Sequence, residues 1–316
     1  MVEARAAALA TRSIKTSAKQ AGLLLAMSML DLTTLEGKDT PEKVRALCAK
    51  AVRPFERDED VLGFRVPSVA AVCVYPSMVP AARASLESLG PVGAGVKIAA
   101  VATAFPSGQF PLDVRLDDTR RAILAGAHEI DMVINRGALL AGRLDEVADE
   151  IRQVKRVCLS TLCPGRPDHA VGLKVILETG ELETFDLVRR ASDAALAALH
   201  DVERELGPTS ALDFIKTSTG KVQPAATLPG TLVMLEAVRD HFLRTGHRVG
   251  VKPAGGIRTA KQSLQYLVMV NETVGDDWMN PDRFRIGASS LANDILRQLV
   301  RALGGRYVAH YEFSEC

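Results

Sequence analysis

The sequence has few aromatic residues and almost no excess of charge of either sign. Its 316 residues include nine Phe, four Tyr and one Trp, and 39 Lys and Arg stand against 38 Asp and Glu, which gives a net charge of +1. A strongly basic face that could hold a nucleic-acid backbone is therefore not expected, and aromatic platforms for stacking bases are scarce. We expect small-molecule partners and no nucleic acid.

Metal-binding cysteine and histidine spacings are also missing. The five cysteines are an odd number and contain no Cys-x-x-Cys pair, which argues against a disulfide framework or a structural zinc site. The six histidines show neither the His-x-His nor the His-Glu-x-x-His spacing of common metal sites. We expect neither a metal ion nor an organic cofactor.

Long apolar runs are absent as well. Residues 21–30 form an apolar stretch behind several basic residues, but it is too short to cross a bilayer and lacks a clear cleavage site. We therefore expect no membrane association and a reducing, cytoplasmic location. A transit peptide within residues 1–20, which hold Arg, Ala and Ser with one Glu, is the alternative.

The chain does contain short apolar runs that alternate with longer amphipathic stretches. Strands are expected at 27–32, 69–75, 96–105, 129–135, 171–177, 213–217, 250–252 and 284–287. Helices are expected at 41–52, 112–125, 144–157, 182–206, 228–242, 259–270 and 290–303, with a charged loop or short helix at 53–64.

Eight consecutive strand–helix units predict an α/β fold, a single (β/α)8 TIM barrel. We assign residues 1–22 to an N-terminal helical extension, 23–306 to the barrel and 307–316 to a C-terminal tail. A doubly wound open sheet is the alternative, but it requires a Gly-x-Gly-x-x-Gly type of phosphate fingerprint after an early strand, which the sequence lacks.

Charged residues occupy the expected strands, whose C-terminal ends form the active site of such a barrel. They are Asp31, Asp131, Lys174, Lys216 and Lys252. A lone lysine there more often forms a salt bridge, but three lysines on successive strands, about 4.8 Å apart, would share a desolvated space with only two nearby carboxylates. Because Lys216 has a like charge on each side, we expect it to have the lowest pKa of the three.

A neutral lysine can attack a carbonyl carbon and form a Schiff base, which accepts electrons when an adjacent C–C bond breaks. Asp131 and Lys252 would carry protons to and from the intermediates. The pattern therefore predicts class I aldolase chemistry at Lys216.

Small residues follow the last three expected strands, at Gly220, Gly255, Gly256 and Ser289. Such residues let backbone N–H groups approach an anion, and a helix N-terminus after Ser289 adds its dipole. These small residues together predict a binding site for a phosphate monoester. Tight turns with a helix cap are the alternative.

The chain resembles the deoxyribose-phosphate aldolase family from about residue 31 to residue 290. Eight separate motifs carry the resemblance, and they begin at Asp31 (DLTTL), Val72 (VCVYP), Phe105 (FPSG), Glu129 (EIDMVIN), Lys174 (KVILETGE), Phe214 (FIKTSTGK), Lys252 (KPAGGIR) and Gly287 (GASS). The N-terminal extension is more similar to the longer, animal-type members than to the short bacterial ones.

This resemblance implies reversible cleavage of 2-deoxy-D-ribose 5-phosphate to D-glyceraldehyde 3-phosphate and acetaldehyde, in deoxyribonucleoside catabolism. It implies that Lys216 is the Schiff-base lysine, that Lys252 perturbs it and that Asp131 is the proton relay. It also implies a second set of residues, with Asp31, Thr33 and Cys73 around the substrate chain, Lys174 beside the relay, and Gly220, Lys221, Gly255, Gly256, Ser289 and Ser290 around the phosphate.

The sequence leaves alternatives for the function, for the role of the tail and for the oligomeric state. A class I aldolase for another phosphosugar and a non-catalytic phosphosugar-binding barrel are the rival functions. Some short members of the family carry a terminal tyrosine that reaches the active site, and Tyr311 is the candidate here, with burial of the tail on the surface as the alternative. Assembly into a homo-oligomer is also left open.

Overall fold

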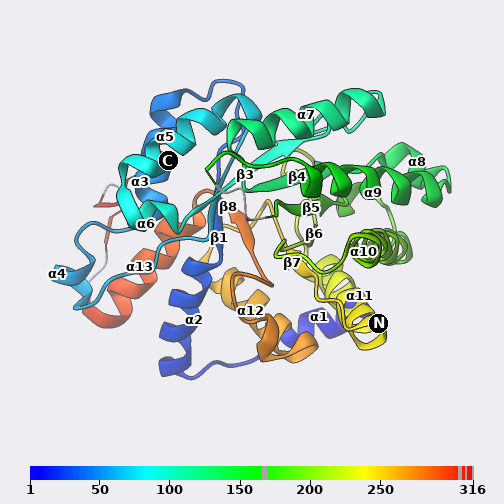
Figure 1. Ribbon diagram of the computed structural model, residues 1–316. Coiled ribbons are helices and arrows are strands. Elements are labelled where there is room, and N and C mark those ends of the chain that lie inside the picture. Colours follow the sequence, from blue (N-terminus) through cyan, green and yellow to red (C-terminus); the bar gives the residue numbers. More distant parts are fainter. Residues whose placement is uncertain (166–169, 305–307, 310–311, 315–316) are drawn as a thin grey trace.

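Eight parallel strands form a closed barrel in the computed structural model, which describes all residues except 166–169, 305–307, 310–311 and 315–316 (Figure 1). The strands are β1 (Leu30–Thr33), β2 (Ala71–Val74), β3 (Lys97–Ala102), β4 (Glu129–Val133), β5 (Gly172–Ile176), β6 (Phe214–Lys216), β7 (Gly250–Lys252) and β8 (Ile286–Ala288). Their order is β7-β6-β5-β4-β3-β2-β1-β8, and bridges from Val251 to Phe284 and from Ala254 to Gly287 join the two ends. The predicted (β/α)8 barrel is confirmed.

Helices surround the strands on the outside of the barrel (Figure 1). They are α1 (Val2–Ala10), α2 (Thr16–Ser28), α3 (Pro41–Val52), α4 (Asp58–Leu62), α5 (Val79–Ser88), α6 (Gly90–Ala94), α7 (Leu112–Ala125), α8 (Arg136–Leu140), α9 (Leu144–Ser160), α10 (Phe185–Leu206), α11 (Leu228–Thr245), α12 (Ala260–Val274) and α13 (Leu291–Gly304). Short 3₁₀ turns lie at Pro76–Met78, Thr179–Glu181 and Asp276–Trp278. Each helix in the described part of the chain is too short or too polar to cross a bilayer.

Local sequence signals explain where the long helices begin and end. The hydroxyls of Thr184 and Thr227 accept hydrogen bonds from backbone N–H groups in the first turns of α10 and α11. Thr259 and Gln262 form a reciprocal capping box at the start of α12. Helix α7 ends at Gly126, whose φ of 115° a residue with a side chain rarely adopts. The expected bounds of α3 and α7 are confirmed.

Most strands are shorter than the sequence pattern suggested. The strand expected at 96–105 ends at Ala102, because Thr103 and Ala104 both have a φ of 61° and turn the chain out of the extended conformation. The Thr103 hydroxyl accepts a hydrogen bond from the Val133 N–H at 2.7 Å, in place of a strand partner. The strand expected at 27–32 begins only at Leu30, since helix α2 continues through Ser28. The β8 strand is displaced two residues toward the C-terminus at its start.

The N-terminal extension consists of two helices, where the sequence pattern indicated one. Helix α1 packs against α11 and α12, and α2 packs against α12 and α13. The expected boundary at residue 22 falls inside α2, at Gly22, where a Cβ atom would lie 2.8 Å from the side chain of Leu264. The two helices therefore cover the outer helices on one side of the barrel. The charged segment 53–64 contains the short helix α4.

The inside of the barrel is divided between apolar and charged side chains. A small apolar group fills the side of β2 and β3, with Cys73, Ala99 and Val101 at its centre. The side formed by the other strands is charged, and these charges form the site described next.

Candidate active site

Four of the predicted site residues meet inside the barrel because of the strand register. Asp131 on β4 pairs with Lys174 on β5, and Lys216 on β6 pairs with Lys252 on β7. Lys174 lies opposite Phe214, so it is two residues deeper in the barrel than Lys216. The exposed fraction is 3% for Lys216 and 0% for the other three side chains.

The carboxylate of Asp131 contacts all three lysines. Its Oδ2 accepts hydrogen bonds from the Nζ of Lys216 at 2.7 Å and of Lys252 at 2.9 Å, and its Oδ1 accepts one from Lys174 at 3.1 Å. The Sγ of Cys73 lies 3.9 Å from the same Oδ2. Asp131 is therefore the centre of the cluster.

The cluster contains more charges than the sequence pattern indicated. Glu129 forms an ion pair with Lys174, and Arg285 donates to Asp31 at 2.8 Å and to Glu129 at 3.2 Å. Lys252 in turn contacts Asp31 at 2.5 Å. The expectation of three cations with two carboxylates is wrong. Counted over these residues of the described chain, three carboxylates face four cations.

Sequence alone offered a weak signal for the two additional residues. Glu129 lies two positions before Asp131 and Arg285 two positions before Gly287, so alternation along a strand turns them into the barrel interior. The signal is weak because alternation alone does not distinguish a charge that belongs to the site from an ordinary salt bridge.

Asp131, Lys174 and Lys252 hold one another in their ionised forms. Burial alone would raise the pKa of Asp131, but Lys174, Lys216 and Lys252 outweigh it and hold the pKa well below its usual range. Burial would lower the pKa of Lys252, yet Asp131 and Asp31 raise it far above that of a free lysine. Burial is likewise outweighed at Lys174, whose pKa is raised mainly by Asp131 and Glu129. Lys174 and Lys252 are therefore ammonium ions at neutral pH.

Lys216 is the cluster lysine that faces a pocket. A cavity of about 440 Å³ opens at the C-terminal ends of the strands, and Lys216 lines it. Asp31, Asp131, Lys174 and Lys252 lie beneath its floor, fully buried. A small molecule that enters the cavity would meet the amine of Lys216 before any other group of the cluster.

Cys73 is not suited to act as a nucleophile. Its thiol is fully buried, and burial together with the charge of Asp131 raises its pKa to about 11. At neutral pH the thiol is protonated, and it contributes a small, weakly polar surface beside Asp131.

The rim of the pocket carries the residues expected around an anion. Gly220, Gly255 and Gly256 have φ values of 78°, 79° and 80°, which only glycine adopts readily. At Gly255 a Cβ atom would also lie 2.8 Å from the side chain of Ala225. The remaining predicted residues that line the cavity are Thr33, Lys221, Ser289 and Ser290. The two serines are exposed and directly precede α13, so the positive end of that helix faces the rim.

Several residues that sequence reasoning did not select also line this cavity. Arg258 and Lys43 add positive charge, whereas Glu36 pairs with Lys221 at 3.0 Å. Arg258 ends the motif that starts at Lys252, and its position after a strand was the available signal. Tyr311, the candidate from the tail, lies outside the described residues.

Hydrogen bonds fix two of the loops that form the rim, those after β6 and β7. The Ser218 hydroxyl donates to the Ala254 carbonyl at 2.6 Å, and the Thr217 hydroxyl accepts from the Ala254 N–H at 2.9 Å. Buried Glu178 accepts a hydrogen bond from the Thr219 N–H at 3.2 Å. The rim is thereby held in place relative to the lysines below it.

Comparison with known proteins identifies the family. The model of the DeoC/LacD family aldolases matches residues 25–296. The chain belongs to this family. The "Deoxyribose-phosphate aldolase" of Mus musculus is 44% identical over 309 residues, 96% of this chain and 88% of the mouse protein. That of Homo sapiens is 43% identical over 306 residues, with the same coverage. The resemblance stated from the motifs is confirmed.

Solved structures of DeoC/LacD-like proteins share the barrel. The apo form of a putative deoxyribose-phosphate aldolase from Toxoplasma gondii has 25% identity and a TM-score of 0.71, and the match covers 90% of this chain and 98% of that one. A putative deoxyribose-phosphate aldolase from Coccidioides immitis has 26% identity and a TM-score of 0.61, with 86% and 85% covered. The overall arrangement of the chain thus agrees with that of proteins described as putative deoxyribose-phosphate aldolases.

Proposed function

We propose that this aldolase reversibly cleaves 2-deoxy-D-ribose 5-phosphate to D-glyceraldehyde 3-phosphate and acetaldehyde, with Lys216 as its Schiff-base lysine. The observation that carries the proposal is the position of Lys216, which lines the pocket and contacts the same Asp131 oxygen as a permanently charged Lys252. The mammalian relatives named deoxyribose-phosphate aldolases support the choice of substrate.

In the cleavage direction, the neutral amine of Lys216 adds to the C1 aldehyde of the open-chain sugar. Loss of water from the carbinolamine gives a protonated imine. Removal of the proton from the C3 hydroxyl then breaks the C2–C3 bond, and the bonding electrons move into the imine to give an enamine. D-Glyceraldehyde 3-phosphate leaves with the new aldehyde, the enamine is protonated at C2, and water hydrolyses the imine to release acetaldehyde.

Asp131 and Lys252 are proposed to move the protons of these steps. Asp131 stays ionised at neutral pH because its pKa is well below the usual range. It can therefore accept a proton from the nitrogen of Lys216 or from the carbinolamine. Lys252, an ammonium ion 2.9 Å from Asp131, can donate a proton in the steps that need one. Lys174 holds the other carboxylate oxygen at 3.1 Å and thereby fixes the orientation of the relay.

The rim is proposed to bind the 5-phosphate. Positive-φ glycines expose backbone N–H groups, Lys221 and Arg258 supply charge, and α13 directs its N-terminus toward the same space. Thr33, which lines the cavity, is proposed to border the carbon chain. Asp31 and Cys73 are fully buried and are proposed to act on the substrate through Lys252 and Asp131, which they contact.

The decisive experiment combines product identification with covalent trapping. Purified protein given 2-deoxy-D-ribose 5-phosphate is expected to release acetaldehyde and D-glyceraldehyde 3-phosphate in equal amounts. Borohydride added with acetaldehyde is expected to leave a two-carbon label on the peptide that contains Lys216. A label confined to Lys174 or Lys252 would contradict the catalytic assignment, and binding without cleavage would favour a non-catalytic phosphosugar-binding barrel.

Replacing Ser289 by Asp is expected to weaken binding of the phosphorylated sugar. The new carboxylate would lie where the phosphate is proposed to bind, so KM for 2-deoxy-D-ribose 5-phosphate should rise about tenfold or more. The KM for unphosphorylated 2-deoxyribose should rise much less. Ser289→Asn, of similar size but uncharged, is the matched control in the same steady-state assay. Equal losses for both sugars would place the phosphate elsewhere.

We also propose a cytoplasmic location and self-association. Cys48, Cys73 and Cys158 are buried free thiols, as expected in a reducing compartment. A structural relative from Aeropyrum pernix with 25% identity and a TM-score of 0.53 is described as tetrameric. Light scattering on the purified protein tests the second proposal.

A further inference from the structure

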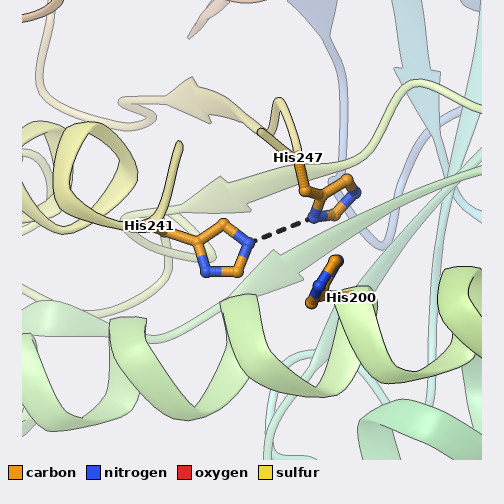
Figure 2. Close-up of side chains that lie close together, drawn as sticks. All are labelled: His200, His241 and His247. Atoms are coloured by element: carbon orange, nitrogen blue, oxygen red, sulfur yellow. Dashed lines mark hydrogen bonds between the residues drawn. The ribbon is translucent and has the colours of Figure 1, made fainter. Parts of the chain in front are cut away.

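Three histidines meet at the end of the barrel opposite the pocket (Figure 2). His200 lies on α10, His241 on α11, and His247 in the loop that leads into β7. Their ring centroids are 5.2 to 5.5 Å apart, and one ring nitrogen from each lies within 4.8 Å of the others. His247 precedes the start of β7, whereas Lys252 ends that strand, so this histidine cluster is separate from the lysine site.

The spacing of the rings suits a transition-metal ion. His241 Nε2 and His247 Nδ1 are 3.2 Å apart. In a tetrahedral zinc site, with Zn–N distances of about 2.0–2.1 Å, two ligand nitrogens are about 3.3 Å apart. The third nitrogen, within 4.8 Å, needs only a small side-chain movement to complete the set. We propose that His200, His241 and His247 bind a divalent first-row transition-metal ion, with Zn²⁺ the best match to three imidazoles.

A carboxylate already orients one of the three rings. His247 Nε2 lies 2.8 Å from Glu203 Oε2, so this nitrogen carries the hydrogen that is donated, and the lone pair of Nδ1 points into the cluster. Metal-bound histidines in proteins are commonly held in this way, because the carboxylate selects the tautomer and makes the ligand more basic.

The cluster also contains a buried nitrogen atom that lacks a hydrogen-bond partner. The Nδ1 of His200 is buried without a hydrogen-bond partner, which is costly unless another group completes it. A bound metal ion would give the three rings a shared partner.

The surroundings leave room for a fourth ligand and balance much of the nearby charge. His200 and His247 line an open cavity of about 640 Å³, through which water can reach the ion. Lys155 at the edge of this cavity is paired with Asp213 at 2.7 Å. Arg248 is paired with Asp277 at 2.9 Å. We expect three imidazoles and one water molecule as ligands.

Such an ion would join α10, α11 and the entry to β7. These three segments meet at the end of the barrel that lies away from the chemistry, where residues contribute to stability. The ion is therefore expected to stabilise the fold and to leave the aldolase reaction unchanged. The inference does not depend on the proposed substrate.

Cobalt is the probe for this site, because tetrahedral Co²⁺ absorbs strongly in the visible region. Full-length protein freed of metal with EDTA is expected to bind about one Co²⁺ per chain, with bands at roughly 500–650 nm that Zn²⁺ abolishes by displacement. His200→Gln and His247→Gln should each weaken binding about 10–100-fold or more. His128→Gln is the matched control, because His128 is a partly buried histidine outside the cluster. This variant should bind Co²⁺ as the wild type does.

The unfolding temperature and borohydride trapping provide two further tests of the proposed metal site. Zn²⁺ is expected to raise the unfolding temperature of wild type and His128→Gln, but not of the two cluster variants, whose folding is checked by circular dichroism and by borohydride trapping. The inference is overturned if the wild type binds no Co²⁺ at about 100 μM, or if the cluster variants bind as tightly as the control. Loss of trapping after EDTA treatment of the wild type would instead contradict the metal-independent aldolase mechanism.

Discussion

Lys216→Arg is expected to fold normally and to lose about 10⁴-fold or more of the cleavage rate. Arginine keeps a positive charge beside Asp131, which lies 2.7 Å from the native amine, so the buried carboxylate retains a partner. A guanidinium group stays protonated and cannot add to an aldehyde carbon. Turnover of 2-deoxy-D-ribose 5-phosphate and mass spectrometry after borohydride treatment measure the two effects.

The control for this variant is Lys221→Met at the rim of the same pocket. It removes a charge from the proposed phosphate site but leaves the floor unchanged, so acetaldehyde, which has no phosphate, should still be trapped on Lys216 at close to the wild-type rate. If Lys216→Arg acquired the two-carbon label on another lysine at the wild-type rate, Lys216 would not be the nucleophile.

Asp131→Asn is expected to have the largest combined effect on stability and catalysis. The substitution leaves Lys174, Lys216 and Lys252 buried around a neutral amide, and breaking a buried ion pair in this way costs about 3–5 kcal/mol. Loss of the proton relay should reduce kcat by about 10²–10⁴-fold. Urea unfolding and steady-state kinetics at neutral pH measure the two losses separately.

The pH dependence of stability provides a second measurement on the same variant. The pKa of Asp131 is lower in the folded protein than in the unfolded chain, so its contribution is fully present above the unfolded value of about 4. That contribution is lost as the pH falls from there toward the folded pKa. Wild type should therefore lose stability below about pH 4 more steeply than Asp131→Asn does.

Glu129→Gln is the matched control for Asp131→Asn. It removes the carboxylate that pairs with Lys174 and Arg285 deeper in the barrel, but Glu129 does not contact Lys216. We expect a similar loss of stability with a much smaller loss of kcat. If both variants lose kcat equally, Asp131 acts through the general charge balance of the cluster and is not the relay.

The alternation of strands and helices could be predicted because each βα unit carries its own signal. Buried strands appear as continuous apolar runs, and Thr227 or Gly126 marks a helix end with local chemistry. Strand ends were less predictable. Thr103 and Ala104 are ordinary residues in sequence, and their positive φ values accompany hydrogen bonds with the distant residues Val133 and Asp118.

The lysine cluster was predictable in part, because three lysines in apolar runs are visible without a structure. Their depth in the barrel was not predictable, since Lys174 and Lys216 are offset by two residues in a register that only strand pairing defines. The histidine cluster was invisible for a related reason. His200 and His241 come from different helices, and their proximity follows from helix packing around the barrel.

The division between an exposed rim and a buried floor has an evolutionary consequence. The groups proposed for bond making are packed at 0–3% exposure, where almost any substitution disturbs a neighbour's charge. Ser289, Ser290 and Gly256 stand in contact with solvent, where changes leave the core intact. Substitutions in the rim loops can therefore change which aldehydes and sugars are accepted. The buried residues proposed for the reaction stay the same.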